Sequence, residues 1–180
     1  DDVRRDAERF HGCYPDVPLF LLGHSMGSFL GRLYAVRYSH SISALIIHGT
    51  GGSNPLVALG KLVAKLNILL CGEKNRSRFL KKLSVGSYNK RFPKEEGHNA
   101  WLSRDIEKVK PKDKDERANF VFTSRAYYDL FTMLGDSNSK EWYKSYPKDM
   151  KTLVISGDMD PVGNFGKGVK EVYNNLLQSR

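Results

Sequence analysis

The sequence predicts an α/β fold whose parallel sheet is interrupted by a long helical insertion. Two observations carry this prediction. Short apolar runs that suit buried strands alternate with segments of helical periodicity at both ends of the chain. Between them, the chain shows helical spacing but no convincing strand alternation. We therefore expect a core formed by residues 1–52 and 146–180, with residues 53–145 as a helical insertion into it.

The first part of the core is predicted to run helix, strand, helix, strand. Residues 1–11 place apolar side chains at helical spacing among Asp and Arg, and turn residues follow them. Residues 18–22 and 43–48 are apolar runs of strand length, and residues 26–38 between them have one apolar face. Apolar runs of this kind are typical of parallel strands that are covered on both faces.

The insertion and the end of the chain complete the predicted order. Residues 55–70 and 79–83 have helical spacing, residues 106–118 are charged and suit a solvated turn and helix start, and residues 119–134 predict a long amphipathic helix. A third apolar run and a final amphipathic helix then follow, over residues 150–156 and 166–177.

Three strands make an incomplete sheet. A parallel sheet of this size leaves two hydrophobic edges open. We therefore expect its edges to pair with strands from outside this sequence or from another chain. The sequence also begins with Asp1 rather than Met, which suggests a start inside a longer product.

The composition is that of a globular domain. Hydrophobic residues make up 40% and charged residues 27% of the 180 positions, enough for one sizeable core. No apolar run reaches the length of about 18 residues that a transmembrane helix needs. Cys13 and Cys71 lack zinc or redox spacing. Two free thiols favour a cytoplasmic location, and a single Cys13–Cys71 disulfide is the alternative.

The net charge of +9 is concentrated in the insertion. Residues 53–138 carry 17 Lys and Arg against 10 Asp and Glu. Such a segment admits transient contact with an anionic membrane surface, although a solvated basic surface is the simpler interpretation. Only the net charge favours nucleic-acid binding, and we expect no nucleic-acid partner.

A G-x-S-x-G pattern joins the first predicted strand to the helix after it. In such a turn the serine sits at the apex in a strained conformation, and flanking glycines leave room for the bend. We predict that Ser25 is a catalytic nucleophile, with Gly23, His24 and Gly27 forming the elbow around it. The N–H of Met26, at the start of the helix, is the predicted oxyanion donor. The alternative is a tight turn with an ordinary serine.

A carboxylate is expected after the nucleophile in chain order. The loop that follows the third predicted strand holds Asp158 and Asp160, at the sheet edge that also carries Ser25. We favour Asp160 as the acid, because it lies deeper in the loop and Pro161 fixes the turn after it. Asp158 is better explained as a turn former that caps its own backbone.

No candidate base follows this acid. The histidines that precede it are His11, His24, His40, His48 and His98. His24 is expected to point away from the attack face and to help pack the elbow, and His40 and His48 suit ordinary surface or core positions. His98 lies in the insertion and would need a non-standard arrangement to serve as the base. The simplest account places the catalytic histidine beyond Arg180.

A nucleotide-binding alternative has little support. The segment from Gly49 to Asn54 fits a G-x-G-x-x-G loop poorly, because its last position is Asn rather than Gly.

Taken with their surroundings, the elbow and the acid loop resemble the α/β-hydrolase superfamily. The nearest branch is similar to monoacylglycerol lipases, lysophospholipases and serine aminopeptidases. The resemblance rests on the elbow with its strand and helix at 19–38, the strand and glycine loop at 43–52, a helical cap at 53–145, and the acid loop at 150–169. It implies a partial α/β-hydrolase fold, with Asp160 at the fourth position of a G-x-x-D loop.

The resemblance also implies an activity. A serine esterase of this type transfers an acyl group from a small lipid-like ester, such as a monoacylglycerol or lysophospholipid, to the serine and then to water. No metal or organic cofactor is implied. The early strands with the second oxyanion donor, the last strand and the histidine are missing. We therefore expect a central fragment that hydrolyses esters poorly by itself, with a non-enzymatic scaffold as the alternative.

The cap is expected to influence substrate choice. Its aromatic cluster could line an acyl pocket, although packing between cap helices explains the same residues: Phe120, Phe122, Tyr127, Tyr128 and Phe131.

Overall fold

The computed structural model describes residues 1–93 and 97–179. The chain forms two compact units. The first comprises residues 1–53, 133–158 and 162–180, and the second comprises residues 54–132 and 159–161.

The first unit is built on a three-stranded parallel sheet. Its strands are β1 (Phe20–His24), β2 (Ala44–His48) and β3 (Lys151–Ile155), in the order β1-β2-β3. In register, Gly23 lies beside Ile47, and Ile47 lies beside Val154. Because all three strands are parallel, their carboxyl ends meet at one edge of the sheet, where the elbow and the acid loop begin.

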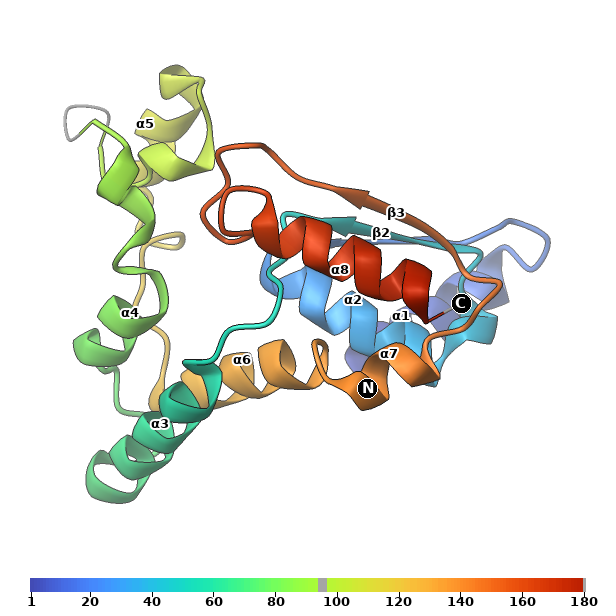
Figure 1. Cartoon of the computed structure of the whole chain (residues 1–180), viewed down its shortest axis with the longest axis horizontal. Coiled ribbons are helices and arrows are strands. Elements are labelled where there is room, and N and C mark those ends of the chain that lie inside the picture. The colour runs from blue at the N-terminus through green and yellow to red at the C-terminus, as the bar shows by residue number, and fades with distance from the viewer. Residues whose placement is uncertain (94–96, 180) are drawn as a thin grey trace. The chain divides into compact units, whose positions relative to one another are not determined.

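Helices cover one face of this sheet. The helices of the first unit are α1 (Asp2–Cys13), α2 (Met26–Arg37), α7 (Lys140–Ser145) and α8 (Lys167–Gln178). Figure 1 shows α2 and α8 on the same side of the strands. On that side Leu45 and Ile47 of β2 are fully buried and pack with Ala35 of α2 and Val172 of α8.

The opposite face of the sheet is exposed. Its large apolar side chains are 48–59% accessible to solvent: Phe20, Leu22, Leu153 and Ile155. The expectation of open hydrophobic edges therefore understated the exposure, because the outer faces of both edge strands also lack cover, while Ile46 of β2 between them is half-buried.

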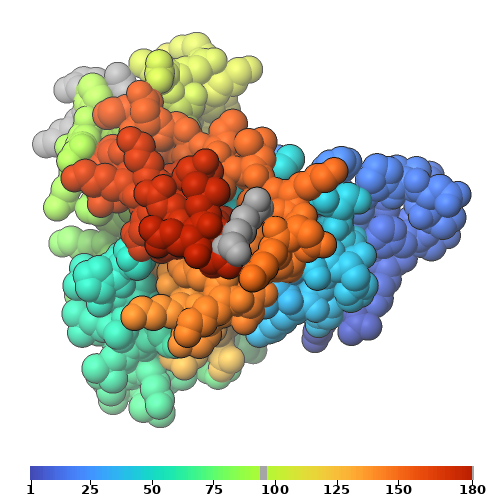
Figure 2. Space-filling view, turned by 45° about the vertical axis from the view of Figure 1, so that its right-hand side comes forward, coloured from blue at the N-terminus to red at the C-terminus, as the bar shows by residue number. Residues whose placement is uncertain are grey.

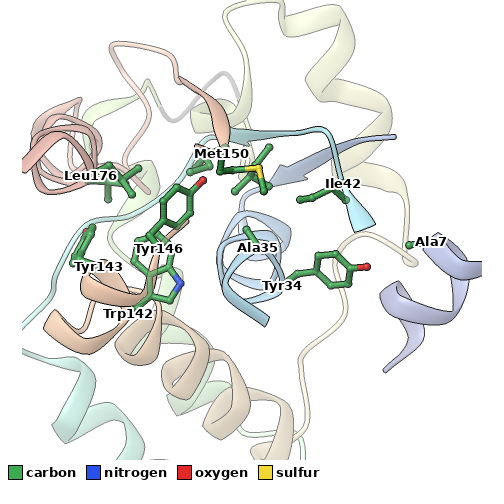
Figure 3. Packing of buried hydrophobic residues seen from close by; sticks show 12 residues of the cluster. Ala7, Tyr34, Ala35, Ile42, Trp142, Tyr143, Tyr146, Met150 and Leu176 are labelled. Atoms are coloured by element: carbon green, nitrogen blue, oxygen red, sulfur yellow. The ribbon is translucent and has the colours of Figure 1, made fainter. Parts of the chain in front are cut away.

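Aromatic side chains from α7 and the turn after it complete the core. Trp142, Tyr143 and Tyr146 are buried beside Met150, just before β3 (Figure 3). The Trp142 and Tyr146 rings lie 5.1 Å apart, and the Trp142 indole N–H donates a hydrogen bond to the Arg32 carbonyl oxygen of α2. These contacts attach the segment before β3 to the helix after β1.

The second unit is helical in the described residues. It contains α3 (Val57–Cys71), α4 (Arg78–Val85), the short 3₁₀ turns Tyr88–Arg91 and Ala100–Leu102, α5 (Ile106–Lys114) and α6 (Ser124–Asp136), whose last residues belong to the first unit. Ser124 fixes the start of α6, because its hydroxyl donates to Asn67 Oδ1 at 2.6 Å and lies 3.0 Å from the Asn75 carbonyl oxygen. Among the described helices, none is both long and apolar enough to cross a bilayer.

Most elements lie close to where the sequence placed them, with three differences. No helix was predicted for Lys140–Ser145, which forms α7. The helix expected over 119–134 begins only at Ser124. Residues 133–145, assigned to the cap, are counted with the first unit, because Trp142 and Tyr143 of α7 pack into its core. The use of the remaining insertion as a substrate cap stays a prediction.

Candidate active site

Ser25 occupies a strained turn between β1 and α2. Its backbone angles are φ 53° and ψ −120°, so a residue with a side chain has a positive φ. This conformation is costly for any residue except glycine and persists only where the surrounding structure enforces it. The chain therefore reverses within one residue, from the last residue of the strand, His24, to the first residue of the helix, Met26.

Gly23 is required by space, but Gly27 is not. A Cβ on Gly23 would stand 2.4 Å from the Gly27 carbonyl oxygen, a backbone atom that cannot rotate away. A Cβ on Gly27 would meet no atom within 4 Å. The expectation that both elbow glycines leave room for the turn is therefore wrong for Gly27 and right for Gly23. The difference arises because Gly23 lies against the backbone of the first turn of α2, at Gly27 and Ser28, whereas Gly27 faces open space.

Hydrogen bonds hold Ser25 from both sides. Its N–H donates to the His48 carbonyl oxygen of β2 at 3.0 Å, which continues the sheet ladder one residue past the strand. Its own carbonyl oxygen accepts from the Ser28 N–H at 2.9 Å and from the Ser28 hydroxyl at 2.6 Å. The strain at Ser25 is thus balanced by three bonds to neighbouring elements.

Ser28 links the elbow to a buried polar network. Its hydroxyl lies 2.8 Å from the Thr50 hydroxyl in the loop after β2, and both side chains are almost completely buried. Thr50 in turn accepts a hydrogen bond of 3.4 Å from the guanidinium of Arg32. Each hydroxyl has one proton to donate. The Ser25 carbonyl oxygen can only accept, so Ser28 donates its proton to Ser25, and Thr50 donates to Ser28.

Arg32 is a fully buried cation at the centre of this network. Its guanidinium donates to the carbonyl oxygens of Gly51 at 3.2 Å and of Ser137, and to Asn138 Oδ1 at 3.0 Å. It also lies over the Trp142 ring, with 4.5 Å between the guanidinium carbon and the ring centroid. Burial lowers the pKa of Arg32 to about 10. Carbonyl dipoles and an aromatic face replace water around the charge.

The predicted oxyanion donor stands at the start of α2. The N–H of Met26 is the first of a 12-residue helix, and helix geometry gives it no intrahelical acceptor. The amino end of a helix favours negative charge, so this group suits an oxyanion formed at Ser25.

His24 is exposed to solvent, and its role in packing the elbow stays a prediction. Its ring lies 4.6 Å from the ring of His48, its register partner on β2. Within the described part of the first unit, no side chain forms a hydrogen bond with Ser25 Oγ. His11 binds the Ser41 carbonyl oxygen at 2.8 Å, and His40 lies in the 3₁₀ turn Ser39–Ser41. The prediction that the base lies outside this sequence stays a prediction.

The acid loop starts at the expected edge of the sheet. Residues 156–158 follow β3, at the edge where Ser25 follows β1. Asp160 belongs to the second unit, together with Met159 and Pro161. In that unit, burial and then the charge of Asp160 raise the pKa of Tyr88 above its ordinary value. The role of Asp160 as the acid stays a prediction.

The aromatic residues of the insertion have mixed environments. Tyr127 and Phe131 are buried in the core of the second unit, whereas Phe120 is 51% exposed. Ring centroids of Phe122 and Tyr127 lie 5.5 Å apart. Core packing therefore explains Tyr127 and Phe131. Among the described residues, no group of three His, Cys, Asp or Glu side chains is placed to hold a metal ion.

A parallel sheet that leads into a strained serine and then into a helix defines an α/β-hydrolase. The chain belongs to the serine aminopeptidase S33 family, whose sequence model matches residues 1–179. This confirms the resemblance to the superfamily and to its serine aminopeptidase-like group, and it places the chain among esterase, lipase and peptidase folds.

Three relatives illustrate the match. The chain is 26% identical over 171 residues to proline iminopeptidase PfmaB of Pestalotiopsis fici, covering 89% of this chain and 56% of the relative. It is 30% identical to a highly thermostable carboxyl esterase from Bacillus coagulans, with a TM-score of 0.90 over 99% of this chain and 58% of the esterase. A soluble variant of monoglyceride lipase from Saccharomyces cerevisiae shares the fold, with 17% identity and a TM-score of 0.62 over 96% of this chain and 53% of the lipase.

The chain thus spans little more than half the length of these relatives.

Sequence reasoning found the elbow but missed the polar network of Ser28, Thr50 and Arg32. One signal was present: Arg32 lies three residues from both Phe29 and Ala35, on an otherwise apolar helix face.

Proposed function

We propose that this chain carries the nucleophile of a serine hydrolase that cleaves carboxylic esters. The observation that carries the proposal is the positive φ of Ser25, held by bonds from β2 and α2. Strain of this kind is typical of functional residues. Glycine adopts a positive φ without this strain, and the chain has a serine at the position.

The proposed reaction is a two-step acyl transfer. Ser25 Oγ attacks the ester carbonyl carbon while a histidine base takes its proton, and the N–H of Met26 binds the resulting oxyanion. The alcohol leaves with a proton from that histidine, and water then hydrolyses the acyl-enzyme. In this proposal Asp160 orients the histidine, which belongs to a part of the protein outside this sequence, as does the second oxyanion donor.

The proposed substrates are small lipid-like esters, such as monoacylglycerols or lysophospholipids. Support comes from the carboxyl esterase of B. coagulans, which is 30% identical to this chain. The curated relative named as a proline iminopeptidase supports a competing amide substrate. A set containing a monoacylglycerol, a lysophospholipid and a prolyl anilide separates these classes. We expect the esters to be hydrolysed faster than the prolyl anilide.

Covalent labelling tests the nucleophile directly. A fluorophosphonate should modify Ser25 in the protein of natural length, and peptide mass mapping should locate the adduct. Ser25→Ala removes the adduct, whereas Ser103→Ala, at an exposed serine of the insertion, leaves it unchanged. Labelling of the longer protein but not of these 180 residues alone would support an incomplete machinery. Labelling of neither would favour the non-enzymatic scaffold.

A further inference from the structure

Helix α3 buries its small residues and exposes its large ones. Its buried positions are Val57, Gly60 and Ala64. A Cβ on Gly60 would stand 3.1 Å from the ring of Phe131 on α6, so α3 packs closely on this side. Leucines in α3 and at its N-cap are 48–83% exposed: Leu56, Leu59, Leu62, Leu66, Leu69 and Leu70. An ordinary amphipathic helix does the reverse.

The exposed leucines form one stripe. At 3.6 residues per turn they fall within about 140° of the helix circumference. The helix has 15 residues, so the stripe is about 22 Å long. In the space-filling view the teal segment that contains α3 lies on the surface (Figure 2). An apolar strip of this length marks an interaction site rather than a solvated face.

Helix α4 extends the apolar surface. Its amide at Leu80 is capped by the Ser77 hydroxyl at 3.3 Å, and Leu80 itself is fully buried. Phe79 and Leu83 of the same helix are 63% and 38% exposed. Helix α4 therefore packs on the rest of the second unit through Leu80 and exposes Phe79 and Leu83 to solvent.

The segment that contains α3 and α4 is strongly basic. Residues 54–91 hold nine Lys and Arg and one acidic residue, a net charge of +8 against +9 for the whole chain. The acidic residue, Glu73, lies 3.3 Å from the Arg125 guanidinium and so is already paired. Lys65 of α3 and Arg78 and Lys82 of α4 are exposed.

We propose that α3 and α4 form a docking surface for an anionic phospholipid bilayer. Exposed leucines enter the boundary between headgroups and acyl chains, while Lys65, Arg78 and Lys82 contact lipid phosphates. Apolar burial joined to basic charge is the combination that holds interfacial helices on anionic membranes. This inference does not rest on hydrolysis by Ser25.

Charge and hydrophobicity together select the bilayer among other occupants. A second copy would bring two surfaces of the same strong positive charge together, and they would repel. Nucleic acid would satisfy the basic residues but would give a stripe of leucines no apolar surface to enter. An anionic bilayer satisfies both features at once.

Vesicle co-sedimentation tests the proposal with the protein of natural length and with this chain. We expect binding to phosphatidylcholine vesicles that contain phosphatidylglycerol, weaker binding to pure phosphatidylcholine, and a decrease with salt. Leu62→Ser with Leu69→Ser should weaken binding about ten-fold or more. The control is Leu30→Ser with Leu177→Ser, at exposed leucines of α2 and α8, and it should bind like the parent.

Charge variants provide the second arm. Lys65→Gln with Lys82→Gln should weaken binding to the anionic vesicles about 25-fold, since each charge near such a surface contributes about five-fold. Lys144→Gln with Lys170→Gln, at exposed lysines of the first unit, is the control. Ser25→Ala should bind vesicles like the parent, which separates this result from the fate of the proposed hydrolase activity.

Three results would overturn the proposal. The charge variant could bind as tightly as the parent, which would remove the role of the anionic lipid. Sedimentation velocity could show a dimer that the leucine variant dissociates, which would assign the stripe to a second copy. The protein of natural length could ignore vesicles that this chain binds, which would mean that another part of that protein covers the stripe.

Discussion

The N–H of Ser25 donates a hydrogen bond of 3.0 Å to the carbonyl oxygen of His48. Ser25 follows β1, and His48 is the last residue of the neighbouring strand β2. The bond therefore extends the parallel ladder into the turn itself. It fixes the amide plane before the nucleophile, while Ser28 fixes the plane after it. The geometry of the elbow therefore depends on the sheet as much as on the local sequence.

Gly23→Ala should destabilise the chain, and Gly27→Ala should not. The new Cβ at position 23 would meet the Gly27 carbonyl oxygen at 2.4 Å, and relief requires movement of the backbone. We expect the free energy of unfolding to fall by about 2 kcal/mol or more. Gly27→Ala, in helix α2 with open space around it, should leave stability unchanged or raise it by up to about 1 kcal/mol. Urea unfolding measures both, and equal losses would contradict the elbow geometry.

Replacement of Arg32 should be costly although the side chain is a buried charge. Arg32→Met leaves the carbonyl oxygens of Gly51 and Ser137 without their donor. Relief of the buried charge offsets part of this loss, so we expect a net loss of about 2–4 kcal/mol in unfolding free energy. Arg37→Met, at an exposed position of the same helix, should change it by less than about 0.5 kcal/mol. Similar values for the two variants would show that the network contributes nothing.

Tyr88 should make the stability depend on alkaline pH. Burial and the charge of Asp160 raise the pKa of Tyr88 from its ordinary value of 10.0. The fold thus favours the neutral phenol, and this contribution is complete below the ordinary pKa and lost as pH rises through the raised pKa. Tyr88→Phe should remove that part of the alkaline loss in a pH series of thermal melts.

The interaction between Tyr88 and Asp160 can also be tested by absorbance spectroscopy. The difference in phenolate absorbance between the parent and Tyr88→Phe isolates the titration of Tyr88. Asp160→Asn should move its pKa part of the way back towards the ordinary value, because burial remains the larger cause. Asp158→Asn should leave it unchanged. An unaltered titration in Asp160→Asn would mean that the two side chains do not interact.

The two faces of the sheet should respond differently to polar substitution. Leu22→Thr and Leu153→Thr alter side chains that are 58% and 53% exposed, so each should cost less than about 1 kcal/mol. Ile47→Thr alters a fully buried side chain of β2 and should cost about 3 kcal/mol. Chemical denaturation compares them. A cost at Leu22 as large as that at Ile47 would mean that the outer face is covered in solution.

Local patterns explain why the fold was largely predictable. The elbow needs only a strand-length apolar run, a glycine two residues before the serine and a helix behind it, and all three lie within 20 contiguous residues. The three strands were found because buried parallel strands leave nearly continuous apolar runs. The six-residue helix α7 was missed, since a segment of that length has too few residues to show a period.

Long-range contacts explain what the sequence could not predict. The bond between Arg32 and the Ser137 carbonyl joins residues 105 positions apart, and no local pattern records it. The exposure of the outer sheet face was equally hidden, because Leu22 and Leu45 look alike in sequence and differ only in what packs against them. The assignment of Asp160 also rests on chain order, which states where a carboxylate follows a strand but not what surrounds it.

The buried guanidinium of Arg32 has a consequence for how such a chain can diverge. It binds Gly51, two residues before the first unit gives way to the second, and Ser137, soon after the chain returns. The side chain of Arg32 thus attaches to α2 both the point where the chain leaves the first unit and the point where it returns. The segment between them can be lengthened, shortened or exchanged while its two attachment points keep their places. A hybrid that carries a foreign insertion between residues 54 and 132 should therefore retain the backbone of the elbow as long as Arg32 is kept.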